Sequence, residues 1–138
     1  MRKAFFFLLL MGLAAWASAD YSVTEIDFLN ASGLEFNGAG PLLIQVDVAR
    51  NRLVTANTLS SSVSLIDCAT GEVVNIPIGG RALQHLKSES MTISAATGHI
   101  YLIGRNCLHI VNPDEKSSRQ VPTDVQFESI AVDQHSGN

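Results

Sequence analysis

Short alternating apolar segments, separated by turn residues, run through most of the chain from residue 41 onward. Tight-turn sequences such as Ala69-Thr70-Gly71 and Thr97-Gly98 stand between these segments, and no segment keeps a helical spacing of apolar positions. Runs of about five residues with turn chemistry between them are typical of an antiparallel β-meander. We therefore expect an all-β fold with strands at 21–28, 43–48, 52–56, 63–67, 72–78, 90–95, 99–103, 108–111, 119–121 and 129–133.

The order of strands and turns repeats along the chain. Val46-Asp47, Ile93-Ser94 and Val132-Asp133 each close the first strand of a unit, and the intervals between them are 47 and 39 positions. Four short strands in about 40–45 residues are the arithmetic of a β-propeller blade. A β-sandwich with accidental self-similarity is the alternative interpretation of the same spacing.

One unit also resembles a known family of repeats. Leu53 to Asn57, a polar loop at 60–62, Val63 to Asp67, a Thr-Gly turn and Ile76 to Gly80 follow one another in that order. This unit is similar to a YVTN-type β-propeller repeat, which typically reads Tyr-Val-Ala-Asn, a polar loop, Val-Ser-Val-Ile-Asp, a Thr-Gly or Thr-Asn turn, and Ile-Pro-Val-Gly. Leu53 stands where the repeat has tyrosine.

A second unit follows only the outline of the repeat, with Tyr101-Leu102-Ile103-Gly104 and His109-Ile110-Val111-Asn112 in place of the motifs. NHL-type and lactonase-like propellers share this outline. We expect an N-terminal strand and turn segment at 20–40 and a partial β-propeller at 41–138, with blades at 41–80 and 88–123 and a truncated blade at 127–138. Because a closed propeller needs at least four blades, we expect the chain to be the N-terminal fragment of a longer protein.

The first 19 residues have the order of a secretory signal peptide. A basic start, Met1-Arg2-Lys3, precedes an apolar run at 4–16 and the small residues Ala17-Ser18-Ala19. That order predicts cleavage after Ala19 and export to the periplasm or the extracellular space. A membrane anchor is the alternative, but 13 apolar positions fall short of the roughly 20 that a span requires.

Charge and cysteine content narrow the classes of partner. The net charge of the chain is −4. Without the first 19 residues it becomes −6, because residues 20–138 contain seven basic and 13 acidic residues. A chain without a basic excess is not expected to bind nucleic acid by neutralising phosphates. Outside the cytoplasm, Cys68 and Cys107 could form one disulfide or remain two separate thiols.

No catalytic, metal or cofactor motif is visible in the sequence. The histidines at 85, 99, 109 and 135 lie in unrelated contexts, and Ser60-Ser61-Ser62 lacks the glycines of a nucleophile elbow. Gly79-Gly80 is not followed by the Lys-Ser or Lys-Thr of a phosphate loop. We expect Asp67 to bond the backbone of the turn that follows it, as turn aspartates do.

One rim of the predicted blades collects polar and basic residues. The loop after the second strand and the connection between blades emerge on the same rim of a meander, so this rim is a candidate ligand-binding surface. Its predicted members are Asn57, Arg81, His85, Arg105 and Asn106. An ordinary solvated loop surface is the alternative.

The sequence therefore favours a binding or interaction scaffold at the cell envelope, for a protein or carbohydrate ligand. The rival class is a lactonase-like or quinoprotein-related propeller enzyme whose site would lie largely in further blades. Asp47, Ser94 and Asp133 occupy matching positions near the ends of first strands, but their unlike chemistry does not make a site. A surface-layer component would differ from both by assembling with itself in the absence of a ligand.

Overall fold

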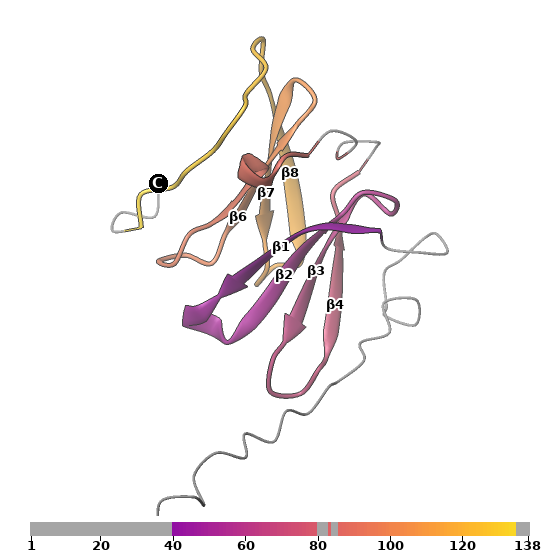
Figure 1. Ribbon diagram of the computed structural model, residues 1–138, viewed down its shortest axis with the longest axis vertical. Coiled ribbons are helices and arrows are strands. Elements are labelled where there is room, and N and C mark those ends of the chain that lie inside the picture. Colours follow the sequence, from indigo (N-terminus) through magenta and orange to yellow (C-terminus); the bar gives the residue numbers. More distant parts are fainter. Residues whose placement is uncertain (1–39, 80–82, 84–85, 135–138) are drawn as a thin grey trace, which may run out of the picture.

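In a computed structural model of the chain, the described residues are 40–79, 83 and 86–134. They form two four-stranded antiparallel sheets that pack together (Figure 1). The predicted all-β class is confirmed, because the helical structure described is limited to two 3₁₀ turns, η1 (Val48–Arg50) and η2 (Ser88–Ser90). The strands are β1 (Pro41–Asp47), β2 (Arg52–Asn57), β3 (Ser62–Asp67), β4 (Val73–Pro77), β5 (Met91–Ile93), β6 (Ile100–Gly104), β7 (Cys107–Asn112) and β8 (Ser117–Pro122).

Each sheet is a meander in which the strands pair in chain order, β1-β2-β3-β4 and β5-β6-β7-β8. The turn at the end of β3 is built as the sequence predicts: Asp67 Oδ1 accepts from the backbone N–H groups of Ala69 and Thr70, both at 2.8 Å. Gly71 has a φ of 74°, which its lack of a Cβ permits. The hydrogen bonds from Thr70 and Ala69 also lower the pKa of Asp67.

Two predicted strands have a different outcome. Residues 21–28 lie outside the described residues. Residues 129–133 form no strand, because Ile130 N donates to Glu89 O in η2 rather than to a neighbouring strand, and no ladder is built there. The segment is instead held near β5 by Gln134, whose Nε2 donates to Ile93 O at 3.1 Å.

The strands of the two sheets pair in the same register. In each sheet, one row of four residues runs straight across the four strands, and each residue of the row in the first sheet has an equivalent in the row of the second. These rows are Ile44, Thr55, Ser64 and Asn75 in the first sheet and Met91, Leu102, His109 and Gln120 in the second. We call the face that carries this row the head face of a sheet.

The opposite face, the tail face, carries the neighbouring row of each sheet, since successive side chains of a strand point to opposite sides. This row is Gln45, Val54, Leu65 and Val74 in the first sheet and Thr92, Tyr101, Ile110 and Arg119 in the second. The two sheets are therefore equivalent units, and any face of one can be matched with a face of the other.

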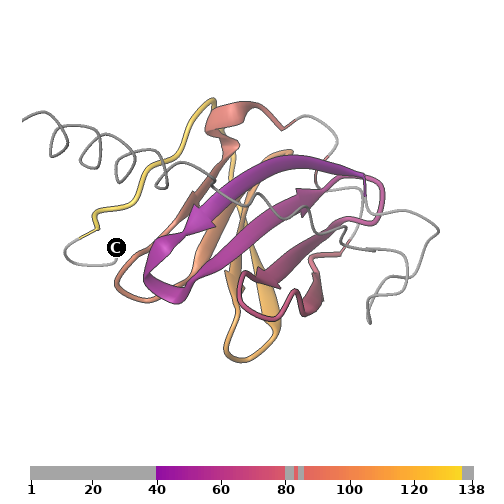
Figure 2. The same cartoon turned by 60° about the horizontal axis from the view of Figure 1, so that its bottom comes forward.

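The tail face of the first sheet packs against the head face of the second. One hydrophobic core contains side chains from both of these faces, and β1 lies beside β5 while β4 lies beside β8 (Figure 2). Gln45 Nε2 donates to Met91 O at 2.6 Å, and Ser118 Oγ donates to Pro77 O at 2.9 Å. The core members from the two facing surfaces are Val54, Ala56, Val63, Leu65, Ile76, Met91, Ile93, Ile100, Leu102 and Val111.

Neither cysteine of the chain is in a disulfide. Cys68 is exposed and Cys107 is buried, and both are free thiols. Within residues 40–79, 83 and 86–134, no helix has the length and apolar character needed to span a membrane.

Candidate binding surface

The predicted ligand-binding rim is only partly described by the structure. Arg105 and Asn106 form the two-residue turn between β6 and β7, and both side chains are exposed. Asn106 has a φ of 57°, and its carbonyl accepts from Thr123 N at 2.9 Å, so the turn itself is anchored. Arg81 and His85 lie outside the described residues.

Asn57 is placed differently from the other rim residues. It ends β2 with its side chain on the head face, and the residue is fully buried. Its Nδ2 donates to Ser62 Oγ at 3.0 Å and to Ser64 Oγ at 2.6 Å, while its Oδ1 accepts from Thr55 Oγ1 at 3.0 Å. The amide of Asn57 is thus used inside the β2–β3 hairpin rather than exposed to a ligand, because the strand alternation turns it onto the sheet face.

This hairpin network extends across the first sheet. Ser60 Oγ lies 2.8 Å from Ser62 Oγ, and Ser64 Oγ donates to Asn75 Oδ1 on β4. Buried hydroxyl and amide groups are tolerated when they bond to one another, and such networks fix a hairpin in one arrangement. A sequence signal for the network exists in retrospect: polar residues occupy alternate positions of two strands that pair.

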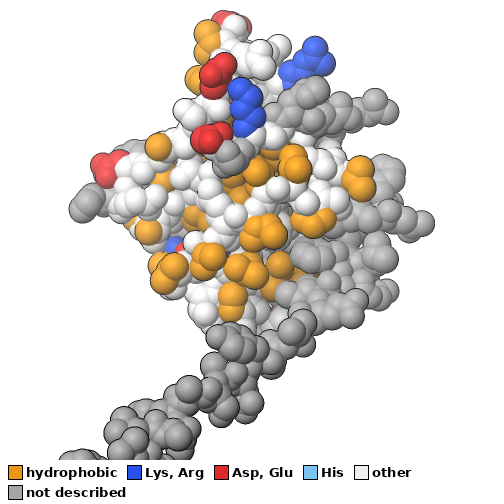
Figure 3. All heavy atoms as spheres, in the orientation of Figure 1, with side chains coloured by type: hydrophobic (Ala, Val, Ile, Leu, Met, Phe, Trp, Pro, Cys, Tyr) orange, Lys and Arg blue, Asp and Glu red, His pale blue; other side chains and the backbone are white. Residues whose placement is uncertain are grey.

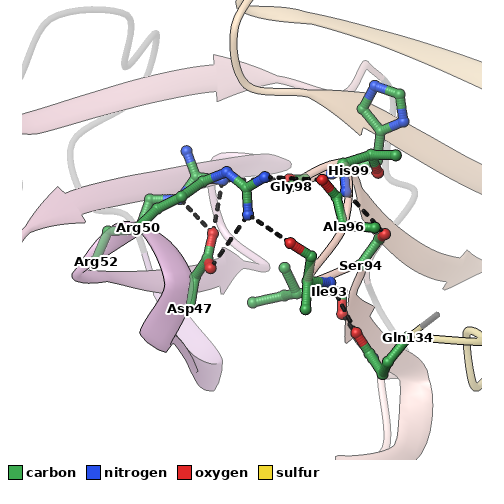
Figure 4. Close-up of polar contacts among 11 residues, drawn as sticks. Asp47, Arg50, Arg52, Ile93, Ser94, Ala96, Gly98, His99 and Gln134 are labelled. Atoms are coloured by element: carbon green, nitrogen blue, oxygen red, sulfur yellow. Dashed lines mark hydrogen bonds and ion pairs between the residues drawn. The ribbon is translucent and has the colours of Figure 1, made fainter. Parts of the chain in front are cut away.

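A second polar cluster joins the two sheets (Figure 4). Asp47 ends β1 and is 3% exposed, and its Oδ2 accepts from Arg52 Nε at 2.9 Å and lies 2.8 Å from Arg52 Nη2. Arg52 is the register partner of Asp47 across the β1–β2 hairpin. Arg50, three residues after Asp47 along the chain, places Nη1 3.5 Å from Asp47 Oδ1. A buried carboxylate held by two guanidinium groups is the arrangement that offsets the desolvation of its charge.

The same arginines reach the turn between β5 and β6. Arg50 Nη1 donates to Ala95 O at 3.2 Å and Arg50 Nη2 donates to Ala96 O at 3.4 Å. Arg52 Nη2 donates to Gly98 O at 3.2 Å. We call Asp47, Arg50 and Arg52 the arginine clamp, because it ties the end of the first sheet to a turn of the second. Asp47 is marked in the sequence by its repeated position at the end of a first strand, whereas nothing in the sequence marks its two arginine partners.

A shallow cleft lies beside the clamp. It has a volume of about 270 Å³ and is lined by Arg50, Arg52, Leu65, Asp67, Glu72 and Val74. Ligand pockets have volumes of roughly 300–1,000 Å³, so this cleft has room for one side chain of a partner or for a very small ligand. Its polar lining contains both signs of charge, and its apolar lining belongs to the tail face of the first sheet.

Cys107 and His109 form a buried pair on the head face of β7. Cys107 Sγ lies 3.3 Å from His109 Nε2, and a Cβ added to Gly104, the register partner of Cys107, would lie 2.7 Å from both atoms. Burial lowers the pKa of His109, which keeps the imidazole neutral. His109 Nδ1 has no hydrogen-bond partner within the described part of the chain.

His109 is almost fully buried, with 1% of its surface exposed. The pair is not joined by further ligating groups: across the described ranges, no three His, Cys, Asp or Glu side chains are grouped so that they could hold a metal ion.

Comparison with known proteins bears on the fold. No family model matches the chain, and no curated protein matches its sequence. A solved structure that resembles it is Kuenenia stuttgartiensis hydrazine synthase, with a TM-score of 0.53 and 14% sequence identity. The match covers 70% of this chain and 27% of that chain, so this chain spans about a quarter of the protein that it resembles. At this identity the likeness shows the fold alone: antiparallel β-sheets arranged as in part of a larger chain.

Proposed function

We propose that this chain is an exported repeat protein of the β-propeller type, related to YVTN repeats, that acts as a binding or interaction scaffold at the cell envelope. The observation that carries this proposal is the head-to-tail packing of two equivalent sheets. Contact between unlike faces of equivalent units leaves one head face and one tail face unmatched, and continued stacking of this kind produces a ring when the rotation closes.

The second sheet carries a tail face suited to continued stacking. In the first sheet, five apolar tail-face residues belong to the core; in the second, the equivalent five positions are all apolar again. A two-sheet sandwich has polar residues on its outer faces, so an apolar outer face favours further stacking. These equivalent sets are Val54, Ala56, Val63, Leu65 and Ile76 in the first sheet and Tyr101, Ile103, Leu108, Ile110 and Val121 in the second.

A scaffold role is supported by how the polar groups are used. The carboxylate of Asp47 is held by two arginines, and the amide of Asn57 is held by hydroxyl groups, so both groups stabilise the sheets. The exposed polar groups at 105–106 lie in a turn between two strands, and loops carried by a rigid sheet are where binding residues concentrate. Export is proposed from the N-terminal signal pattern, which lies outside the described residues.

The test is a binding assay with the chain purified from the envelope fraction of an expression host. The probes are insoluble cell-wall polysaccharide and detergent-solubilised envelope protein, each offered to immobilised chain. A rim variant, Arg81→Ala/His85→Ala/Arg105→Ala, is compared with a matched variant, His99→Ala/Lys116→Ala/Arg119→Ala, which removes the same number of basic residues and histidines elsewhere.

We expect saturable binding of one probe, roughly tenfold weaker for the rim variant and unchanged for the matched variant. Equal binding by all three proteins would contradict a role for the rim. Absence of binding, together with metal-dependent hydrolysis of a lactone by the same preparation, would favour the enzyme class instead.

A further inference from the structure

The cleft beside the arginine clamp combines apolar side chains with charges of both signs. Leu65 and Val74, register partners on β3 and β4, supply the apolar part of its lining. Asp67 is two positions after Leu65 and Glu72 is two positions before Val74, so the two carboxylates continue the same face toward the β3–β4 turn. Four of the six lining residues are charged, whereas few charged side chains are visible over the first sheet in Figure 3.

The two carboxylates of the cleft are open to a cation. Within the described part of the chain, neither Asp67 nor Glu72 forms an ion pair with a lysine or arginine, and both residues are exposed. Asp67 Oδ1 accepts the backbone N–H groups of the turn, and these bonds lower the pKa of Asp67, so its carboxylate is ionised at neutral pH. A cation that enters the cleft therefore meets two negative charges.

Arg52 supplies the opposite charge from the neighbouring strand. Its register partners are Asp47 on β1 and Asp67 on β3, and its guanidinium pairs with Asp47. Among the described residues its Nε and Nη2 donate to Asp47 and Gly98, which leaves Nη1 for another acceptor. The clamp as a whole carries one net positive charge, because one carboxylate is held by two guanidinium groups.

We propose that this cleft binds a free α-amino acid with an apolar side chain. Such a ligand carries a carboxylate and an ammonium group on one carbon atom, so it matches two opposite charges on neighbouring strands. Arg52 binds the carboxylate, Asp67 and Glu72 bind the ammonium group, and the apolar side chain lies on Leu65 and Val74. A simple anion is disfavoured, because the two acidic residues outweigh the net charge of the clamp.

The size of the cleft favours a single amino acid over a peptide. Its volume of about 270 Å³ lies just below the range of roughly 300–1,000 Å³ that larger ligands occupy. All six lining residues belong to the first sheet, whereas the rim turn at 105–106 belongs to the second. The amino-acid site therefore goes beyond the rim ligand proposed above and depends on other residues.

The test is a titration of the ¹⁵N-labelled full chain with L-leucine, followed by two-dimensional ¹H–¹⁵N nuclear magnetic resonance. Two analogues each lack one charge: 4-methylpentanoate has no ammonium group, and 3-methylbutylamine has no carboxylate. Asp67→Asn removes the negative charge and keeps an oxygen for the turn, and Glu72→Gln removes the second charge at an exposed side chain. Glu128→Gln, at an exposed residue outside the cleft, is the matched control.

We expect leucine to shift the amide resonances of residues 65–74 with a dissociation constant of about 1 mM, as befits a shallow site. Each analogue should bind at least about tenfold more weakly, because one charge-assisted contact is lost. Asp67→Asn and Glu72→Gln should each weaken leucine binding at least about threefold, and Glu128→Gln should leave it unchanged. Circular dichroism establishes that each variant is folded, and Glu72→Gln decides if Asp67→Asn does not fold.

Three outcomes would overturn the proposal: no shift at about 50 mM leucine, an analogue that binds as tightly as leucine, or unchanged leucine affinity in the folded cleft variants. A chain that fails to bind leucine and still binds a probe through its rim would remove the amino-acid site and leave the scaffold function standing.

Discussion

Arg52 and Asp47 face one another across the β1–β2 hairpin, and Arg52 Nη2 lies 2.8 Å from an Asp47 carboxylate that is almost fully buried. Truncating one partner of such a pair leaves a buried charge without compensation, at a cost of about 3–5 kcal/mol. We expect Arg52→Ala to lower the free energy of unfolding in urea by about this amount. Arg105→Ala, in an exposed turn, is the control and should change it by less than about 0.5 kcal/mol. Equal effects would contradict the clamp.

Gly98 is constrained both by its positive φ and by the closeness of the Arg50 side chain. Gly98 and Gly71 both have a φ of 74°, but a Cβ at Gly98 would lie 2.6 Å from Arg50 Nε, whereas nothing lies within 4 Å of one at Gly71. Gly71→Ala therefore carries only the cost of a positive φ, about 1 kcal/mol. Gly98→Ala should cost a further 0.5–1.5 kcal/mol, roughly one hydrogen bond, because Arg50 must leave its carbonyl partners.

A thermodynamic cycle checks this account of Gly98. In an Arg50→Ala background the extra cost of Gly98→Ala should vanish, and the two glycine substitutions should become equal within about 0.5 kcal/mol by urea unfolding. An excess that persists without Arg50 would show that another contact is responsible.

Asn57 is expected to affect stability rather than binding. Asn57→Ala removes the acceptor of Thr55 Oγ1, at about 1–3 kcal/mol for a buried group left unpaired, and removes one of the two partners of Ser62 and of Ser64, which keep Ser60 and Asn75. We expect a loss of at least about 2 kcal/mol in urea unfolding, and no change in probe affinity under conditions where the variant is folded. Gln120→Ala removes an exposed amide and should be neutral.

His109 predicts a specific pH dependence of stability. Burial lowers the pKa of His109 in the folded state below its unfolded value of about 6.5, so the unfolded chain takes up a proton first on acidification. The contribution of the neutral His109 to the free energy of unfolding is therefore fully present above about pH 6.5. It decreases as the pH falls below that value, by up to about 1.4 kcal/mol per pH unit. Asp67, whose pKa is lowered, loses its contribution only as the pH falls below about 3.8, in a separate window.

Unfolding measured between pH 7 and pH 5 should therefore lose its slope in His109→Gln and keep it in His99→Gln. A slope that survives the removal of His109 would contradict the buried neutral imidazole.

Local chemistry was enough to predict much of the fold. The alternation around Val63 to Asp67 and the Thr-Gly turn that follows predict β3 and its turn to within one residue, because strand period and turn hydrogen bonds act over a few positions. The same reasoning predicted a strand at 90–95, but β5 ends at Ile93. Ser94 instead accepts from Gly98 N at 2.7 Å, and the turn begins there.

Long-range partners could not be predicted in this way. Arg50 bonds to Ala95, 45 positions away, and nothing near Arg50 in the chain indicates that contact. Asn57 was assigned to the rim by its place at the end of a strand, whereas the side to which its side chain points depends on the register with β3. Which face of each sheet is buried against the other sheet likewise depends on how the two sheets pack, and the sequence of a single repeat does not indicate it.

Unlike faces of the two equivalent sheets meet, and methyl–methyl nuclear Overhauser effects report which faces these are. Neighbouring residues of β2 and β3 point to opposite faces, so Val54 and Leu65 lie on the tail face while Leu53 and Ile66 lie on the head face. We predict cross-peaks from the methyl groups of Met91 and Leu102 to those of Val54 and Leu65, and none to Leu53 or Ile66. Cross-peaks to Leu53 and Ile66 instead would mean that two head faces meet, and would contradict the repeat architecture.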